Sequence, residues 1–95
     1  MSMKESYQKK LRAELDQWGE DIDKLKAKAD KAEASVKIEY YEQIEKLRTK
    51  QASVKDKLIE LTEASDDAWE DLKAGTENAW HSLGEAVKSA ASRFK

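Results

Sequence analysis

The sequence predicts an all-α protein in which a long helix is followed by a shorter antiparallel helix, as a helical hairpin or coiled coil that self-associates. The 95 residues include no proline and only three glycines, and 40% of them are charged. This composition is typical of long helices. Apolar residues recur at heptad spacing through the first two thirds of the chain. The last third repeats an apolar pattern every eleven residues, which keeps one face of a straight helix apolar.

Length and composition limit the classes of function. The chain, residues 1–95, is a single helical domain that buries only about 60 to 70% of its unfolded surface, so we expect self-association to add stability. Without cysteine, neither a disulfide nor a thiolate metal site can form. Twenty acids are interspersed with eighteen bases, which gives no basic surface for nucleic acid. We see no signal peptide or membrane span and expect a cytoplasmic protein.

The first helical segment carries an apolar row with alternating steps of four and three. The row consists of Leu11, Leu15, Trp18, Ile22, Leu25, Ala29, Ala32 and Val36. Such a heptad row favours packing against one partner helix. Gly19 lies inside the row beside Trp18 and costs helix stability, and we interpret it as making room for an indole that faces it.

In the middle segment the apolar row departs from heptad spacing and then returns to it. The shift runs through Val36, Tyr40, Ile44 and Leu47, and the row continues through Gln51, Val54, Leu58 and Leu61. We place Tyr40 in the seam and Tyr41 on its flank. Helix formers dominate, so a single helix over about residues 3–63 is predicted, roughly 90 Å long.

A reversal is predicted at about residues 63–67, followed by a helix over about 66–93. Ser65 or Asp66 can cap this second helix, and acids in its first turn suit the helix dipole. Its apolar stripe repeats Ala68, Trp69 and Leu72 as Ala79, Trp80 and Leu83, and then as Ala90, Ala91 and Phe94. Because the repeat continues across Gly75, we expect a kink or close contact there rather than a helix end.

Folding back at residue 65 covers only the second half of the long helix. We therefore expect a homo-oligomer, with an antiparallel dimer about Glu20 favoured, and a further protein partner as another form of association. The alternative is a three-helix bundle with another reversal near residues 30–35. The predicted interaction face is Leu11, Leu15, Trp18, Ile22, Leu25, Val36, Tyr40, Leu47, Leu58, Leu61, Trp69, Leu72, Trp80, Leu83, Val87 and Phe94.

We predict no catalytic residue, no metal site and no cofactor. Glu77, His81 and Glu85 share one helix face at spacing that holds a divalent ion only weakly, because a defined site needs ligands from several elements. His81 is the only histidine, and its neighbour Ser82 points about 100° away on a helix. An enzyme is therefore not expected.

Two non-enzymatic classes remain. In the first, the tryptophan-bearing stripe is a protein interface. In the second, it inserts into a membrane surface, which usually requires bases on the polar face of the helix. Residues 66–95 hold six acids and four bases, a net charge of −2 that anionic lipid would repel. We rank the membrane surface second.

Two passages resemble a known family: Tyr7 to Leu11 continuing through Trp18 to Ala34, and Ala68 to Gly75 continuing through Phe94. They are similar to small bacterial coiled-coil proteins labelled as a stress-response family of the cyanobacterial and proteobacterial type. The double tryptophan repeat is the most specific part of the likeness. The resemblance implies a soluble helical bacterial protein with a stress-linked role, and it implies no catalytic residue.

Overall fold

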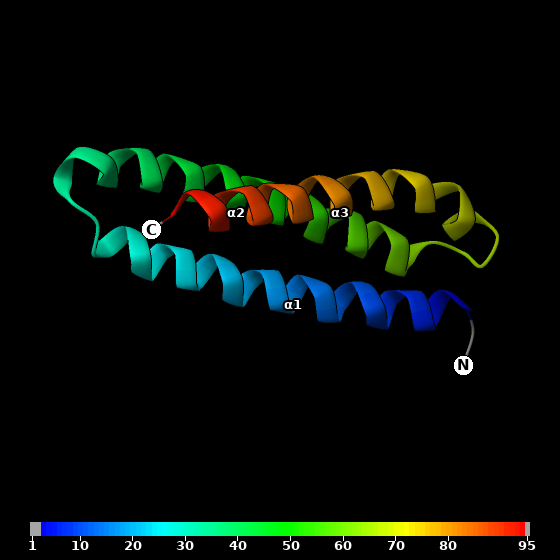
Figure 1. Ribbon diagram of the computed structural model, residues 1–95. Coiled ribbons are helices and arrows are strands. Elements are labelled where there is room, and N and C mark those ends of the chain that lie inside the picture. The colour runs from blue at the N-terminus through cyan, green and yellow to red at the C-terminus, as the bar shows by residue number, and fades with distance from the viewer. Residues whose placement is uncertain (1–2, 95) are drawn as a thin grey trace.

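The computed structural model describes residues 3–94 and is all-α, which confirms the predicted class. Three helices follow one another: α1 (Met3–Asp30), α2 (Ala34–Glu63) and α3 (Ala68–Arg93). They lie side by side, so that α1 and α3 run in the same direction and α2 runs against them (Figure 1). The bundle measures 51 × 19 × 18 Å.

The predicted single helix over residues 3–63 is wrong, because the chain also reverses at residues 31–33. At the end of α1 the amides of Lys31 and Ala32 bond three residues back, to Lys28 and Ala29. Glu33 is extended, and its carbonyl accepts hydrogen bonds from the amides of Val36 and Lys37 in the first turn of α2. The reversal therefore has regular backbone bonding on both sides although it contains neither glycine nor proline.

Packing explains why this reversal forms. A straight helix would leave the α1 residues Leu11, Ile22 and Leu25 in water, at a cost of about 1.5–3 kcal/mol each. The break interrupts only a few backbone hydrogen bonds, each with a net value of about 1 kcal/mol. All three side chains are buried in the structure. Burial of the α1 row thus outweighs the loss of helix continuity.

The second reversal spans residues 64–67, inside the interval expected from the capping signals. The Ser65 hydroxyl accepts the Ala68 amide at 3.2 Å, and the Ser65 carbonyl accepts the Trp69 amide at 3.1 Å. From there α3 runs through Gly75 without ending. A Cβ built on Gly75 would meet nothing within 4 Å, so the close contact expected there is absent.

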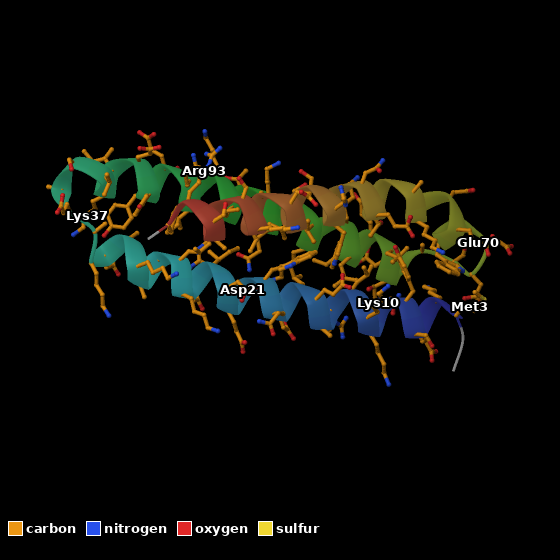
Figure 2. All side chains as sticks on the ribbon, in the orientation of Figure 1. Met3, Lys10, Asp21, Lys37, Glu70 and Arg93 are labelled. Atoms are coloured by element: carbon orange, nitrogen blue, oxygen red, sulfur yellow. The ribbon has the colours of Figure 1, made fainter. Side chains whose placement is uncertain are left out.

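One apolar core runs along the bundle and receives side chains from all three helices. Its buried members are Leu11, Ile22, Leu25, Ala29, Ile44, Leu47, Val54, Leu58, Leu61, Trp69, Trp80, Leu83, Val87, Ala90 and Phe94. Charged side chains cover the outside, among them Lys10, Glu70 and Arg93 (Figure 2). The apolar rows read from the sequence therefore converge within one chain.

Ring contacts between α1 and α3 follow an eleven-residue spacing on both helices. The first aromatic pair joins Tyr7 and Trp69, whose ring centroids are 5.9 Å apart. The second aromatic pair joins Trp18 and Trp80 at 6.1 Å. Because both helices point the same way, one eleven-residue step on each keeps the two rows in register.

The far end of the bundle is closed by a ring stack between α2 and the end of α3. Tyr40 and Phe94 lie 4.1 Å apart between centroids, with 14° between their planes. Tyr40 is half-buried, whereas the neighbouring Tyr41 is exposed. The predicted inward and outward orientations of this tyrosine pair match the structure.

Candidate functional site

The structure places most of the predicted interaction face inside the core of a single chain. Leu11, Ile22, Leu25, Leu47, Leu58, Leu61, Trp69, Trp80, Leu83, Val87 and Phe94 are buried, and Leu15, Trp18, Val36 and Tyr40 are half-buried. Leu72 is the one member of the predicted face that is exposed, at 36%. The α1 row for which a second chain was expected is covered by α2 and α3 of the same chain. Surfaces for partners must therefore be sought outside this row.

The glycine that makes room for the Trp18 indole is Gly84 on α3, and Gly19 is not involved. A Cβ built on Gly84 would lie 3.0 Å from Cζ2 of Trp18. A Cβ on Gly19 would instead lie 3.2 Å from Nε2 of Gln51. The sequence interpretation of Gly19 is thus corrected, because the indole faces α3 and Gly19 faces α2.

A groove opens between α1 and α3 beyond the second aromatic pair. These two helices contact each other less than either contacts α2. The groove has a volume of about 370 Å³. Its lining consists of Trp18, Asp21, Lys24, Leu25, Lys28, Gly84, Val87, Lys88 and Ala91. We call it the α1–α3 groove; it combines an apolar floor with a mainly basic rim.

A second groove of about 300 Å³ lies between α1 and α2. Its lining consists of Arg12, Leu15, Asp16, Lys55, Leu58, Ile59, Thr62 and Glu63. Ile59 is 47% exposed although it is aliphatic. Two bases and two acids surround the apolar centre, so the rim has no net charge. We call it the α1–α2 groove.

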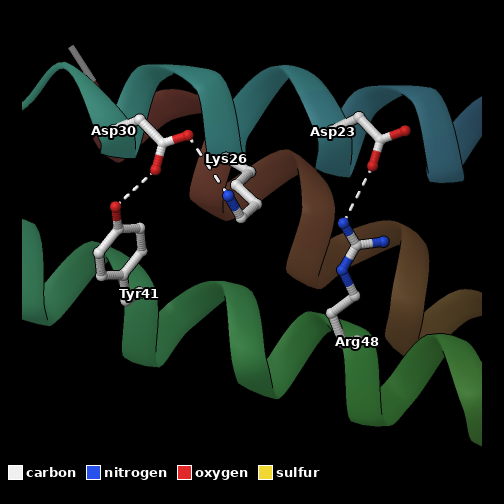
Figure 3. A network of polar contacts seen from close by, with 5 residues as sticks. All are labelled: Asp23, Lys26, Asp30, Tyr41 and Arg48. Atoms are coloured by element: carbon white, nitrogen blue, oxygen red, sulfur yellow. Dashed lines mark hydrogen bonds and ion pairs between the residues drawn. The ribbon is translucent and has the colours of Figure 1, made fainter.

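Polar contacts fix α1 against α2 near the first reversal (Figure 3). Asp30 accepts hydrogen bonds from the Tyr41 hydroxyl and, at 3.3 Å, from Lys26. Earlier on α1, Asp23 accepts a hydrogen bond from Arg48 of α2 at 2.9 Å. The Tyr41 hydrogen bond, followed by Lys26, lowers the pKa of Asp30, and the same hydrogen bond raises the pKa of Tyr41. These exposed contacts orient the helices more than they stabilise them.

The polar face considered for a metal does not converge on one point. Glu77 accepts a hydrogen bond from the Tyr7 hydroxyl at 3.2 Å, while His81 and Glu85 border a shallow pocket beside Trp18. Within residues 3–94 no group of three or more possible metal ligands is found.

The hydroxyl of Tyr7 is the most strongly shifted group beside this face. Burial is the largest cause and the negative charge of Glu77 the second, and together they raise the pKa of Tyr7 to about 12.

Sequence reasoning missed Ile59, Gly84 and the lysines of the α1–α3 groove. One signal in the sequence could have indicated that α1 and α3 are neighbours: Tyr7, Trp18 and Ala29 follow one another at intervals of eleven residues. That spacing matches the repeat of α3 and indicates that the two helices are parallel neighbours.

None of the helices described has an apolar stretch long enough to cross a bilayer. No family model, curated protein or solved structure matches this chain. The resemblance to stress-response coiled-coil proteins thus stays a prediction.

Proposed function

We propose that this chain is a non-enzymatic helical protein that acts through protein–protein contact, first of all with a second copy of itself. The observation that carries the proposal is the α1–α2 groove, whose apolar lining includes the exposed Ile59. Covering an isoleucine contributes up to about 1.5–3 kcal/mol. This groove replaces the α1 row as the proposed interface.

The charges around the groove suit an identical partner. Each helix contributes one base and one acid to the lining, Arg12 with Asp16 on α1 and Lys55 with Glu63 on α2. A two-fold axis sets the same patch of both copies face to face, so a rim that carries both bases and acids allows bases of one copy to meet acids of the other. A side of the bundle, 51 Å by 19 Å, exceeds the area of about 800 Å² that each partner buries in an ordinary interface.

Substitution of Ile59 tests the interface against a matched control. Ile59→Glu places a charge in the apolar centre, whereas Ile38→Glu changes another exposed isoleucine of α2 outside the groove. In light scattering across a concentration series, the wild type and Ile38→Glu are expected to show a dimer of the 10.9 kDa chain. Ile59→Glu is expected to be monomeric. A wild-type monomer at every concentration would contradict the proposal.

The family resemblance adds a stress-linked setting to this proposal. The level of the protein is expected to rise in stressed cells over unstressed ones. An unchanged level would remove this part and leave the interface proposal standing.

Binding to a membrane surface is the second candidate, favoured by the eleven-residue amphipathic repeat of α3. Trp69, Trp80 and Leu83 of that repeat are buried in the bundle, so insertion would require the helices to separate. Flotation with anionic vesicles distinguishes the candidates. The interface proposal expects the protein to stay with the aqueous fraction and the tryptophan emission to stay unchanged.

A further inference from the structure

The third step of the aromatic repeat lacks its rings. After the first and second aromatic pairs, the same spacing reaches Ala29 on α1 and Ala91 on α3. Each step advances about 16 Å along a helix at 1.5 Å per residue. Ala91 lines the α1–α3 groove at this level. The groove thus occupies the stretch where large side chains give way to small ones.

The floor of the α1–α3 groove is apolar. Leu25 and Val87 are core residues that reach it from the two helices, and the half-buried indole of Trp18 closes one end. Gly84 lets that indole lie against the backbone of α3. The volume of about 370 Å³ falls within the range of 300–1,000 Å³ found for small-molecule sites.

The rim of the groove is positive, although the whole chain is negative. Lys24 and Lys28 stand one helical turn apart on α1, and Lys88 stands on α3. Within the part of the chain that the structure describes, none of these three lysines takes part in an ion pair. Asp21 is the single acid of the lining. The local charge therefore favours an anion.

We propose that the α1–α3 groove binds a single-chain anionic amphiphile of the fatty-acid class. Its hydrocarbon chain lies on the floor formed by Leu25, Val87 and Trp18, and its carboxylate contacts the lysines of the rim. A partner helix is about 10–12 Å wide with its side chains and does not fit a groove of this volume. A bilayer needs a broad apolar face, whereas here charged residues border a narrow one.

This site is separate from the proposed dimer interface, since the two linings share no residue. Ligand binding and self-association are therefore expected to be lost by different substitutions. Ile59→Glu serves as the cross-check, because it is expected to bind the amphiphile like the wild type.

Bromine quenches tryptophan on contact, so 12-bromododecanoate reports an acyl chain beside a tryptophan, and of the three tryptophans Trp18 is the one that lines this groove. The expected result is saturable quenching at one ligand per chain, below the micelle concentration. Dodecyltrimethylammonium, with the same tail length and the opposite charge, is the probe for charge selectivity and is expected to compete at least tenfold more weakly. The absence of saturable quenching below about 1 mM would overturn the proposal.

Two variants locate the site. Ala91→Phe adds a ring at the third step and fills the groove. Because Ala91 is exposed, the change is expected to weaken binding at least tenfold without lowering Tm. Lys24→Gln with Lys28→Gln is also expected to weaken binding about tenfold. The control is Lys9→Gln with Lys10→Gln, two exposed lysines of α1 outside the groove, which is expected to stay within twofold of the wild type.

Unchanged affinity in both groove variants would overturn the proposal, as would equal binding of the cationic and anionic amphiphiles. Binding to anionic phospholipid vesicles without binding of dodecanoate monomers would also overturn it and would favour the membrane surface. Circular dichroism of each variant is the control that checks its helicity.

Discussion

Two glycines of α3 have opposite surroundings, and this difference determines how each affects the stability of the protein. Gly75 is exposed with open space around its Cα, whereas Gly84 lies under the Trp18 ring. Within a helix, glycine is less favourable than alanine by about 1 kcal/mol. At Gly84 that cost is offset by the close approach of the indole, which packs in turn against Trp80.

Gly75→Ala is therefore expected to raise the free energy of unfolding by about 1 kcal/mol. Gly84→Ala is expected to lower it by about 1 kcal/mol, because overpacking costs about 1–3 kcal/mol and exceeds the gain in helix propensity. Urea unfolding of the two variants measures the difference. Equal stabilisation by both would show that the Trp18 ring does not rest on α3.

At the scale of the element, the sequence predicted helices better than it predicted their ends. The all-α class and the reversal near Ser65 followed from composition and capping signals. The reversal at 31–33 was predicted only as the alternative fold, near residues 30–35, because Lys31, Ala32 and Glu33 all favour a continuing helix. Tertiary packing of the α1 row determines this reversal, and the local sequence offers no glycine, proline or strong turn signal for it.

Glu33 gives a direct test of this reversal. It precedes α2 as the N-cap residue but makes no side-chain capping bond. Glu33→Asp is expected to stabilise the protein by about 1 kcal/mol, because aspartate is a strong N-cap and glutamate is not. In an unbroken helix the same change would destabilise by a few tenths of a kcal/mol, since aspartate is the poorer helix former. Thermal unfolding therefore distinguishes the two folds by the sign of the change.

The binding surfaces were less predictable than the elements for a related reason. Lys24 and Lys28 share a helix face in the sequence, but nothing local shows that Lys88 stands across from them. Likewise, Ile59 reads as one aliphatic residue among many until α1 is placed beside α2. A groove belongs to two helices at once, so it follows only once their neighbours are known.

At the scale of the whole molecule, the two reversals determine that the apolar rows are buried against one another within one chain. A hairpin would leave the first half of the long helix for a second chain to cover, whereas the bundle closes one core within 95 residues. Association then becomes a property of exposed grooves. Loss of a partner is thus not expected to unfold the chain.

The distance between the start of α1 and the second reversal tests this account most directly. Lys4 donates a hydrogen bond to the carbonyl of Ala64, so these segments touch although sixty residues separate them. The chain has no cysteine, so dyes can be attached at Ser6→Cys and Asp66→Cys alone. At single-molecule dilution, the bundle predicts high energy transfer across no more than its 19 Å width. Low transfer, as for the roughly 90 Å of an unbroken helix, would contradict it.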